Sequence, residues 1–239
     1  MPYTPAHAII TLPINVISRG KIPLASLIVG SMSPDFPYLL ALTTTYAPGH
    51  SWHGVLIYCL LPSVFVLLLW YRWLEKPLLD LFRLPHTPVT FNKMNYCLIV
   101  IGILIGAYSH ALWDASSHYN GAFVVNSYFW NQQLFSLPIY QWNQYGSGIL
   151  GSIALVIWYI VTLAKNRQNN YRGHLTLGLS LFTVSIVFFM VLANLMHHSV
   201  TTLDYLVRSS IGVLSGSAIA ACFYALIVKQ FKGYLKREH

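Results

Sequence analysis

Long apolar runs alternate along this chain with short polar connections, and this alternation predicts membrane-spanning helices. A helix needs roughly 20 mostly apolar residues to cross the hydrocarbon of a bilayer. Five runs approach that length and are the predicted spans, at residues 55–74, 96–113, 149–164, 175–196 and 209–228. We therefore expect an all-α polytopic transmembrane bundle that forms one membrane-embedded domain over residues 1–239, with its motifs in residues 1–150 and additional transmembrane helices in 151–239.

Two shorter apolar runs, residues 6–17 and 22–32, precede these spans. Arg19-Gly20-Lys21 lies between them and is typical of a turn. Because each run is short for a lone span, we expect the pair to form a tight N-terminal helical hairpin packed inside the bundle.

The ends of this hairpin carry polar residues. Thr4-Pro5 is typical of a helix start, with Thr4 as the N-cap. Pro34 and Pro37 are expected to interrupt the helix at the end of the second run. A hairpin of this kind would place His7 and Asp35 at the same end.

Composition supports a membrane protein. Of the 239 residues, 56% are hydrophobic and only 8% charged, and the mean hydropathy is +0.56, which is unusual for a soluble domain. The formal net charge of +8 could suggest nucleic acid as a partner, but the basic residues form short clusters between apolar runs. We expect no nucleic acid, and the lipid bilayer as the main partner.

Alternating the hairpin and the five spans sorts the charged residues by face. Thirteen of the fourteen Lys and Arg residues fall on one face, and only Arg208 falls on the other. The positive-inside bias makes the basic face cytoplasmic, in a cytoplasmic (inner) membrane. The extracytoplasmic face then receives His7, Asp35, His50, His53, His110, Asp114, His118, His197, His198 and Asp204. The neutral stretch 114–148 is expected as an interfacial loop or lid.

His110 and Asp114 are four residues apart, so on a helix they share one face, and His118 continues the series. Imidazole and carboxylate together suit Zn²⁺, and also Mn²⁺ or Fe²⁺. Such an ion lowers the pKa of bound water toward ~7 and supports hydrolysis. The alternative is a structural pairing between His110 and Asp114.

Each remaining candidate has a functional and a structural interpretation. His7 is either a ligand or an interfacial histidine, and Asp35 is a ligand or general base, or an acid at a helix N-terminus. His50 is favoured as a ligand, and His53 as either a residue that supports the ligands or a substrate contact. His118 either takes part in catalysis or a second metal site, or caps the loop. The three others, His197, His198 and Asp204, are more typical of loop residues than of ligands.

Several short motifs resemble a bacterial membrane family known only as a domain of unknown function (4184). They are Met-Pro-Tyr-Thr-Pro-Ala-His at residues 1–7, Gly-Ser-Met-Ser-Pro-Asp at 30–35, Gly-His-Ser at 49–51, Ser-His-Ala-Leu-Trp-Asp at 109–114 and His-Tyr-Asn-Gly at 118–121. The resemblance runs from residue 1 to about 150, and the later spans match only in character.

That family is similar to inner-membrane metal-dependent hydrolases and, more distantly, to the all-helical zinc-dependent phospholipase C group. The resemblance implies a phosphoester or lipid-like substrate, and it implies these metal ligands: His7, Asp35, His50, His110 and Asp114. The soluble enzymes have a second His-x-x-x-Glu pair, whereas both glutamates here, Glu75 and Glu238, fall on the basic face. We therefore expect one or two divalent cations, zinc first, and not three.

The sequence thus favours a metal-dependent hydrolase at the extracytoplasmic face, with Asp35, His53 and His118 as catalytic candidates. The substrate would be a lipid or lipid-linked phosphoester. A second hypothesis is a non-enzymatic transporter or metal-handling protein that uses the same histidines and aspartates. A third is a structural membrane protein in which they form a satisfied polar cluster.

Overall fold

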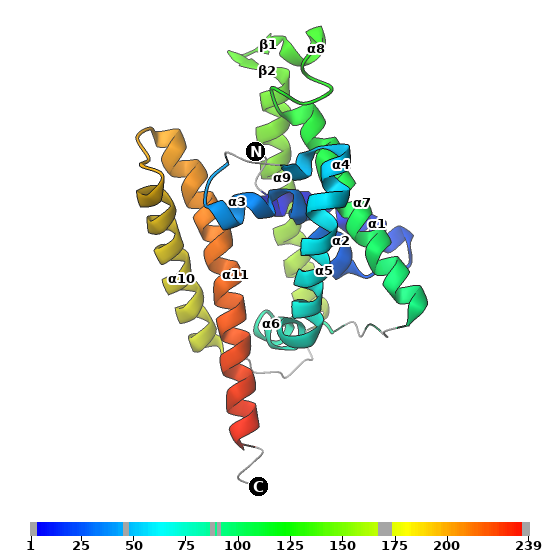
Figure 1. Cartoon of the computed structure of the whole chain (residues 1–239), viewed down its shortest axis with the longest axis vertical. Coiled ribbons are helices and arrows are strands. Elements are labelled where there is room, and N and C mark those ends of the chain that lie inside the picture. The colour runs from blue at the N-terminus through cyan, green and yellow to red at the C-terminus, as the bar shows by residue number, and fades with distance from the viewer. Residues whose placement is uncertain (1–3, 45–47, 87–88, 90–91, 167–173, 236–239) are drawn as a thin grey trace. The chain divides into compact units, whose positions relative to one another are not determined.

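The computed structural model describes residues 4–44, 48–86, 89, 92–166 and 174–235 of the chain, which are almost entirely helical (Figure 1). One two-stranded antiparallel hairpin interrupts the helices. In chain order the elements are η1 (Thr4–Ile10), α1 (Thr11–Ile17), α2 (Leu24–Met32), η2 (Ser33–Asp35), α3 (Phe36–Ala41), η3 (Pro48–His50), α4 (Trp52–Gly54), η4 (Val55–Cys59), α5 (Leu60–Leu69), η5 (Trp70–Leu74), α6 (Glu75–Leu81), α7 (Lys93–Ser117), α8 (Tyr128–Asn131), β1 (Gln133–Leu134), β2 (Leu137–Pro138), α9 (Ile139–Lys165), α10 (Leu175–Met196) and α11 (Thr202–Leu235).

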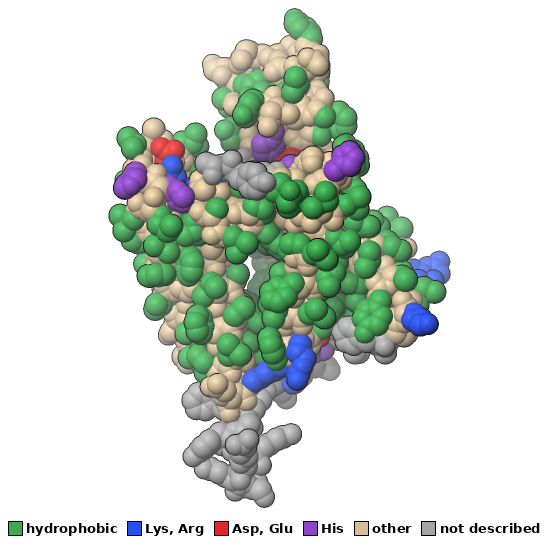
Figure 2. Space-filling model, in the orientation of Figure 1, with side chains coloured by type: hydrophobic (Ala, Val, Ile, Leu, Met, Phe, Trp, Pro, Cys, Tyr) green, Lys and Arg blue, Asp and Glu red, His purple; other side chains and the backbone are tan. Residues whose placement is uncertain are grey.

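Five helices in the described residues are long and apolar enough to cross a membrane, which confirms the all-α, membrane-embedded prediction. They are Trp52–Leu81, Lys93–Ser117, Ile139–Lys165, Leu175–Met196 and Thr202–Gln230. Hydrophobic side chains cover the long helices on the face shown in Figure 2. Exposed apolar residues such as Ile157 on α9 and Val184 on α10 are the surface that lipid would contact.

The predicted span boundaries were too narrow at most ends. The helix expected over 149–164 begins at Ile139, because the polar face of its first turns pairs with α7. Asn143 donates to the carbonyl of Ser116 at 3.2 Å, and Trp113 donates to the Ser147 hydroxyl at 3.0 Å. A stretch of low hydropathy is therefore helical, and the connection expected over 114–148 shrinks to residues 118–138, which hold α8 and the β1–β2 hairpin.

The described chain divides into two compact units, each continuous in space. Unit 1 comprises Met1–Phe36, Ala47–Leu67 and Pro88–Ile160, and unit 2 comprises Pro37–Tyr46, Leu68–Thr87 and Val161–His239. The prediction of one domain over 1–239 stays a prediction. Parts of the basic clusters at 165–172 and 229–237 lie outside the described residues.

Within unit 1, the N-terminal hairpin forms as expected, although its first leg begins as the 3₁₀ helix η1 before it becomes α1. The turn uses positive φ angles at Arg19 (52°) and Gly20 (71°). The interruption expected at the prolines is confirmed for the α-helix, because α2 ends at Met32, directly before Ser33 and Pro34. The chain continues through the 3₁₀ turn η2 into α3, since Pro34 lies in the first turn, where its missing N–H is not needed.

Close packing of α2 on α7 determines where the polar end of α7 lies. A Cβ atom on Gly30 would collide with the backbone of Ile103, and one on Gly106 would collide with the backbone of Leu27. Glycine at both positions lets the two backbones touch. This contact brings the carbonyl of Ser31 beside the His110 ring.

In unit 2, α10 and α11 form a close antiparallel pair. The pair is joined by a hydrogen bond from the Ser185 hydroxyl to the carbonyl of Gly216 at 2.8 Å. Leu78 and Leu81 of α6 pack with Tyr224 and Val228 of α11 in an apolar core.

Candidate metal centre

Histidines and aspartates from four segments of unit 1 meet at the C-terminal end of α7. His110 and Asp114 come from α7 itself, His7 from η1, Asp35 from η2 and His50 from η3. All but His50 are almost completely buried, with His7 2%, Asp35 0%, His110 1% and Asp114 7% exposed. The five residues thus form one buried polar cluster.

On α7, His110 and Asp114 lie one turn apart, with 3.3 Å between His110 Nε2 and Asp114 Oδ2. The other ring nitrogen, His110 Nδ1, donates a hydrogen bond to the carbonyl of Ser31 at 2.7 Å. A carbonyl oxygen can only accept, so Nδ1 carries the proton and Nε2 presents its lone pair to the cluster. This is the arrangement of a metal-binding histidine.

Asp35 is oriented by Thr4. The Thr4 hydroxyl donates to Asp35 Oδ2 at 2.6 Å, and this contact replaces the N-cap role that the sequence suggested for Thr4. The second carboxylate oxygen, Oδ1, lies 3.3 Å from His50 Nε2 and 3.7 Å from His110 Nε2. One oxygen is therefore fixed by a hydroxyl, and the other faces two imidazoles.

His50 Nε2 lies in the middle of the cluster. It is 3.2 Å from Asp114 Oδ2 and 3.3 Å from His110 Nε2. The preceding Gly49 lies against Pro34, where an added Cβ would be 2.9 Å from the Pro34 Cα. Glycine at this position lets the His50 turn approach Asp35 closely.

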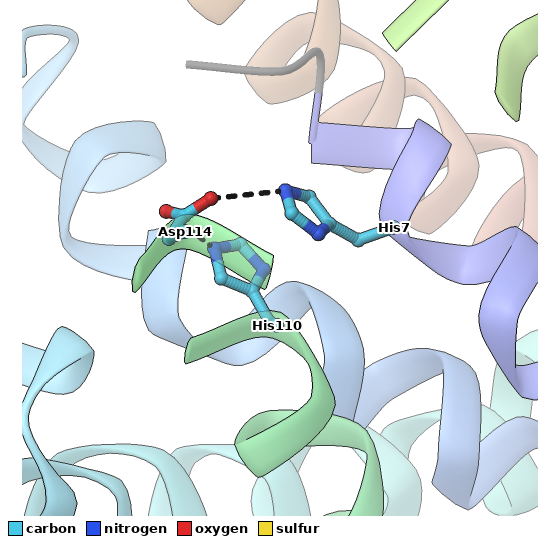
Figure 3. Close-up of side chains that lie close together, drawn as sticks. All are labelled: His7, His110 and Asp114. Carbon is cyan, nitrogen blue, oxygen red and sulfur yellow. Dashed lines mark ion pairs between the residues drawn. The ribbon is translucent and has the colours of Figure 1, made fainter. Parts of the chain in front are cut away.

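His7 completes the cluster from the other side of His110. Its ring stacks on that of His110, with 3.8 Å between centroids, and its Nε2 lies 3.5 Å from Asp114 Oδ1 (Figure 3). The edge of Trp113 covers it, with 5.5 Å between ring centroids. Neither ring nitrogen of His7 has a hydrogen-bond partner among the described residues.

The donor atoms fit a divalent cation. Asp35 Oδ1 and Asp114 Oδ1 are also buried without a hydrogen-bond partner in the described part of the chain, and such atoms are costly unless something binds them. The atoms Asp35 Oδ1, His50 Nε2 and His110 Nε2 are separated by 3.3, 3.3 and 3.7 Å, so a point about 2.0 Å from all three exists, which is the length of a zinc–ligand bond.

The protonation of the groups outside the membrane spans is consistent with a site for positive charge. Burial lowers the pKa of His50, but its contacts with Asp114 and Asp35 outweigh burial and raise that pKa to about 9. Burial beside His110 lowers the pKa of His7 to about 3. Burial raises the pKa of Asp35, yet His110, His50 and the Thr4 hydroxyl together bring it below its ordinary value.

Residues 1–231 match the family model described as "Domain of unknown function (DUF4184)". The chain belongs to this family. The match to the DUF4184 model extends well past residue 150, where the motif resemblance ended. No curated protein and no solved structure matches the chain, so the likeness to metal-dependent hydrolases stays a proposal.

The structure brings some of the other candidates of this DUF4184 chain into the cluster and leaves others out. His118 joins it, with Nδ1 3.5 Å from Asp114 Oδ1. His53 is exposed on α4, and none of the contacts among described residues joins it to the cluster. Asp204 accepts hydrogen bonds from Thr201 at the start of α11 in unit 2, as expected of a loop-end residue. His197 and His198 likewise follow the end of α10 in unit 2.

Sequence reasoning missed the residues that hold the ligands. Ser31 lies 79 positions from His110 in the sequence and acts through its backbone carbonyl, so its residue type carries no signal. Thr4 and Gln144 are polar residues beside apolar runs, which gave only a weak signal. Gln144 is buried on α9, with its side-chain nitrogen 3.5 Å from His118 Nε2.

Proposed function

We propose that this chain is an integral-membrane, metal-dependent hydrolase of a phosphoester, carried by a lipid or a lipid-linked substrate. One observation carries the proposal: at the end of an apolar span, buried atoms of the His7 imidazole and of the Asp35 and Asp114 carboxylates converge without a hydrogen-bond partner among the described residues. A satisfied structural cluster would leave no such atoms unpaired, which argues against the purely structural hypothesis.

Asp35, His50, His110 and Asp114 would hold the ion. Once bound, a divalent cation polarises a phosphoryl oxygen and makes water more acidic. The Ser31 carbonyl keeps His110 in the tautomer that binds through Nε2, and the Thr4 hydroxyl leaves Asp35 Oδ1 free for the ion or for a proton. Against the effect of burial, His110, His50 and the Thr4 hydroxyl hold the pKa of Asp35 below its ordinary value, which favours the carboxylate form that a ligand or general base requires.

The side of the membrane follows from the charges along single helices. In α7, Lys93 begins the helix, whereas His110 and Asp114 lie in its last turns. The helix that follows His50 likewise carries Arg72 and Lys76 toward its far end. Because basic residues favour the cytoplasmic side, we place the cluster at the extracytoplasmic face of the inner membrane.

A lipid substrate suits this location. Asp114 and His50 keep 10% and 21% of their side chains exposed, so the cluster reaches the surface of unit 1. The cluster reaches this surface at the C-terminal end of α7. If α7 spans the membrane, that end lies at the level where polar headgroups meet the hydrocarbon. The scissile phosphoester of a membrane lipid lies at that same level. A soluble substrate, in contrast, does not require a site at the membrane surface.

The test is hydrolysis by the full chain purified in detergent, with phosphatidic acid and bis(p-nitrophenyl) phosphate as probes and metal content measured on the same sample. We expect bound zinc or another divalent cation, and release of phosphate or nitrophenol. The double variant His110→Ala, Asp114→Ala should lose both, whereas His174→Ala, which removes an exposed histidine of unit 2, should lose neither. Well-folded wild-type protein without bound metal would refute the proposal.

The same donors would serve a metal-handling protein, the second candidate. That function predicts exchange of the bound cation with the medium and no turnover of either phosphoester. Metal binding without hydrolysis would therefore favour this candidate over the hydrolase.

A further inference from the structure

Asp114 lies between two pairs of imidazoles. Its Oδ2 is 3.2 Å from His50 Nε2 and 3.3 Å from His110 Nε2. Its Oδ1 is 3.5 Å from His7 Nε2 and 3.5 Å from His118 Nδ1. The two oxygens of one buried carboxylate thus face different sets of nitrogen atoms.

The described residues contain two overlapping groups that can hold a cation, and both include His110. One group is Asp35, His50 and His110, and the other is His7, His110 and Asp114. An imidazole nitrogen binds one ion, and His110 Nδ1 is already bound to the Ser31 carbonyl. If both positions fill, the second needs a different donor in place of His110.

His118, which belongs to neither group, would supply that donor. Its Nδ1 lies as close to Asp114 Oδ1 as His7 Nε2 does. Its Nε2 is 3.5 Å from the side-chain amide of buried Gln144. With the amide oxygen turned toward the ring, Gln144 accepts the Nε2 proton and leaves the Nδ1 lone pair for a ligand.

We propose that a second divalent cation binds at Asp114 Oδ1, held by His7 and His118, so that the Asp114 carboxylate bridges two ions. This proposal rests on the first position, which the proposed function assigns to Asp35, His50 and His110 with Asp114 Oδ2. The two nitrogens and one oxygen of the second position match the open catalytic sites of zinc enzymes, which leave a coordination position for water or substrate. The bridged pair is of the kind that clamps a transferred phosphoryl group between ions about 3.5–4 Å apart.

A competing arrangement explains His118 without a cation. Its Nδ1 is 3.2 Å from the carbonyl of Asp114 and 3.1 Å from the Ser117 hydroxyl, so it can act as the local donor that ends α7. That arrangement gives His118 no role in metal binding. However, it leaves His7 Nε2 and Asp114 Oδ1 buried without a hydrogen-bond partner among the described residues.

The experiment measures divalent metal per chain in full-length protein that has been stripped of metal and reloaded with Mn²⁺. We expect two ions per chain and an electron paramagnetic resonance spectrum broadened by coupling between them. His7→Ala and His118→Ala should each retain one ion and give an uncoupled six-line spectrum, and His174→Ala should behave as wild type.

The outcomes separate this proposal from the proposed function. A single uncoupled ion in wild-type protein, or two ions retained by His118→Ala, would overturn the second position and leave the hydrolase proposal standing. Two coupled ions without phosphoester hydrolysis would overturn the hydrolase and support the pair. No ion in wild type would overturn both. If a variant does not fold, the wild-type stoichiometry and coupling still decide.

Discussion

Replacement of Thr4 by valine isolates one hydrogen bond of the candidate centre. Valine has nearly the shape of threonine but cannot donate to Asp35 Oδ2, which now receives the Thr4 hydroxyl at 2.6 Å. Both residues are buried, so water does not readily replace the lost donor. Asp35 would then be free to rotate, and its Oδ1 would no longer be held toward His50 and His110.

The expected effect is on metal affinity. Removal of a group that orients a ligand typically weakens metal binding about 10- to 100-fold. This loss corresponds to about 1.4–2.7 kcal/mol, similar to the ~1.5–3 kcal/mol of a hydrogen bond to a charged group. Competition with a fluorescent chelator measures the dissociation constant in detergent.

Thr4→Ser is the matched control, because it keeps the hydroxyl and should retain an affinity within a few-fold of wild type. Circular dichroism and gel filtration show whether each variant is folded. A folded Thr4→Val protein with wild-type affinity would show that Asp35 is not a ligand held by Thr4.

Three further predictions concern the proton on His50, the role of His53 and the contact between α2 and α7. Since the pKa of His50 is raised from 6.5 to about 9, a cation must displace its proton at neutral pH. Displacement of this one proton should raise metal affinity about tenfold from pH 7 to 8, and the affinity should level off above pH 9. Calorimetry in two buffers follows this change, and a flat profile would contradict the assignment. His53→Ala should keep its metal but raise the KM for a lipid phosphoester if His53 contacts substrate, and unchanged kinetics would remove His53 from the site. Gly106→Ala should cost about 1–3 kcal/mol of stability and weaken metal binding, because its Cβ would meet the backbone of α2. Gly146→Ala, with nothing within 4 Å of its added Cβ, should leave metal content unchanged and raise thermal stability slightly, because alanine favours the helix interior more than glycine does.

Helical periodicity was enough to predict the pair on α7, because residues four apart share a face whatever surrounds them. The predicted hairpin, in which the chain reverses at Arg19-Gly20-Lys21, also placed His7 and Asp35 at the same end. The interactions that hold these ligands could not be predicted, since the Ser31 carbonyl and the Thr4 hydroxyl act across 79 and 31 positions of sequence. The start of α9 was missed because hydropathy does not show that polar side chains are paired with α7.

The unpaired atoms of the cluster are the strongest physical reason to expect a ligand there. A buried polar atom without a hydrogen-bond partner costs about 1–3 kcal/mol, and among the described residues four such atoms belong to His7, Asp35 and Asp114. Three of them, Asp35 Oδ1, Asp114 Oδ1 and His7 Nε2, also lie in ion-pair contacts of 3.3–3.7 Å, so this cost is an upper bound for each of the three. A proton on His50 offsets only part of it, because that proton lies among Asp35, Asp114 Oδ2 and His110 and does not reach His7. Cations bound to both faces of Asp114 would engage Asp35 Oδ1, Asp114 Oδ1 and His7 Nε2 at once, so metal binding and the folding of unit 1 should be strongly coupled.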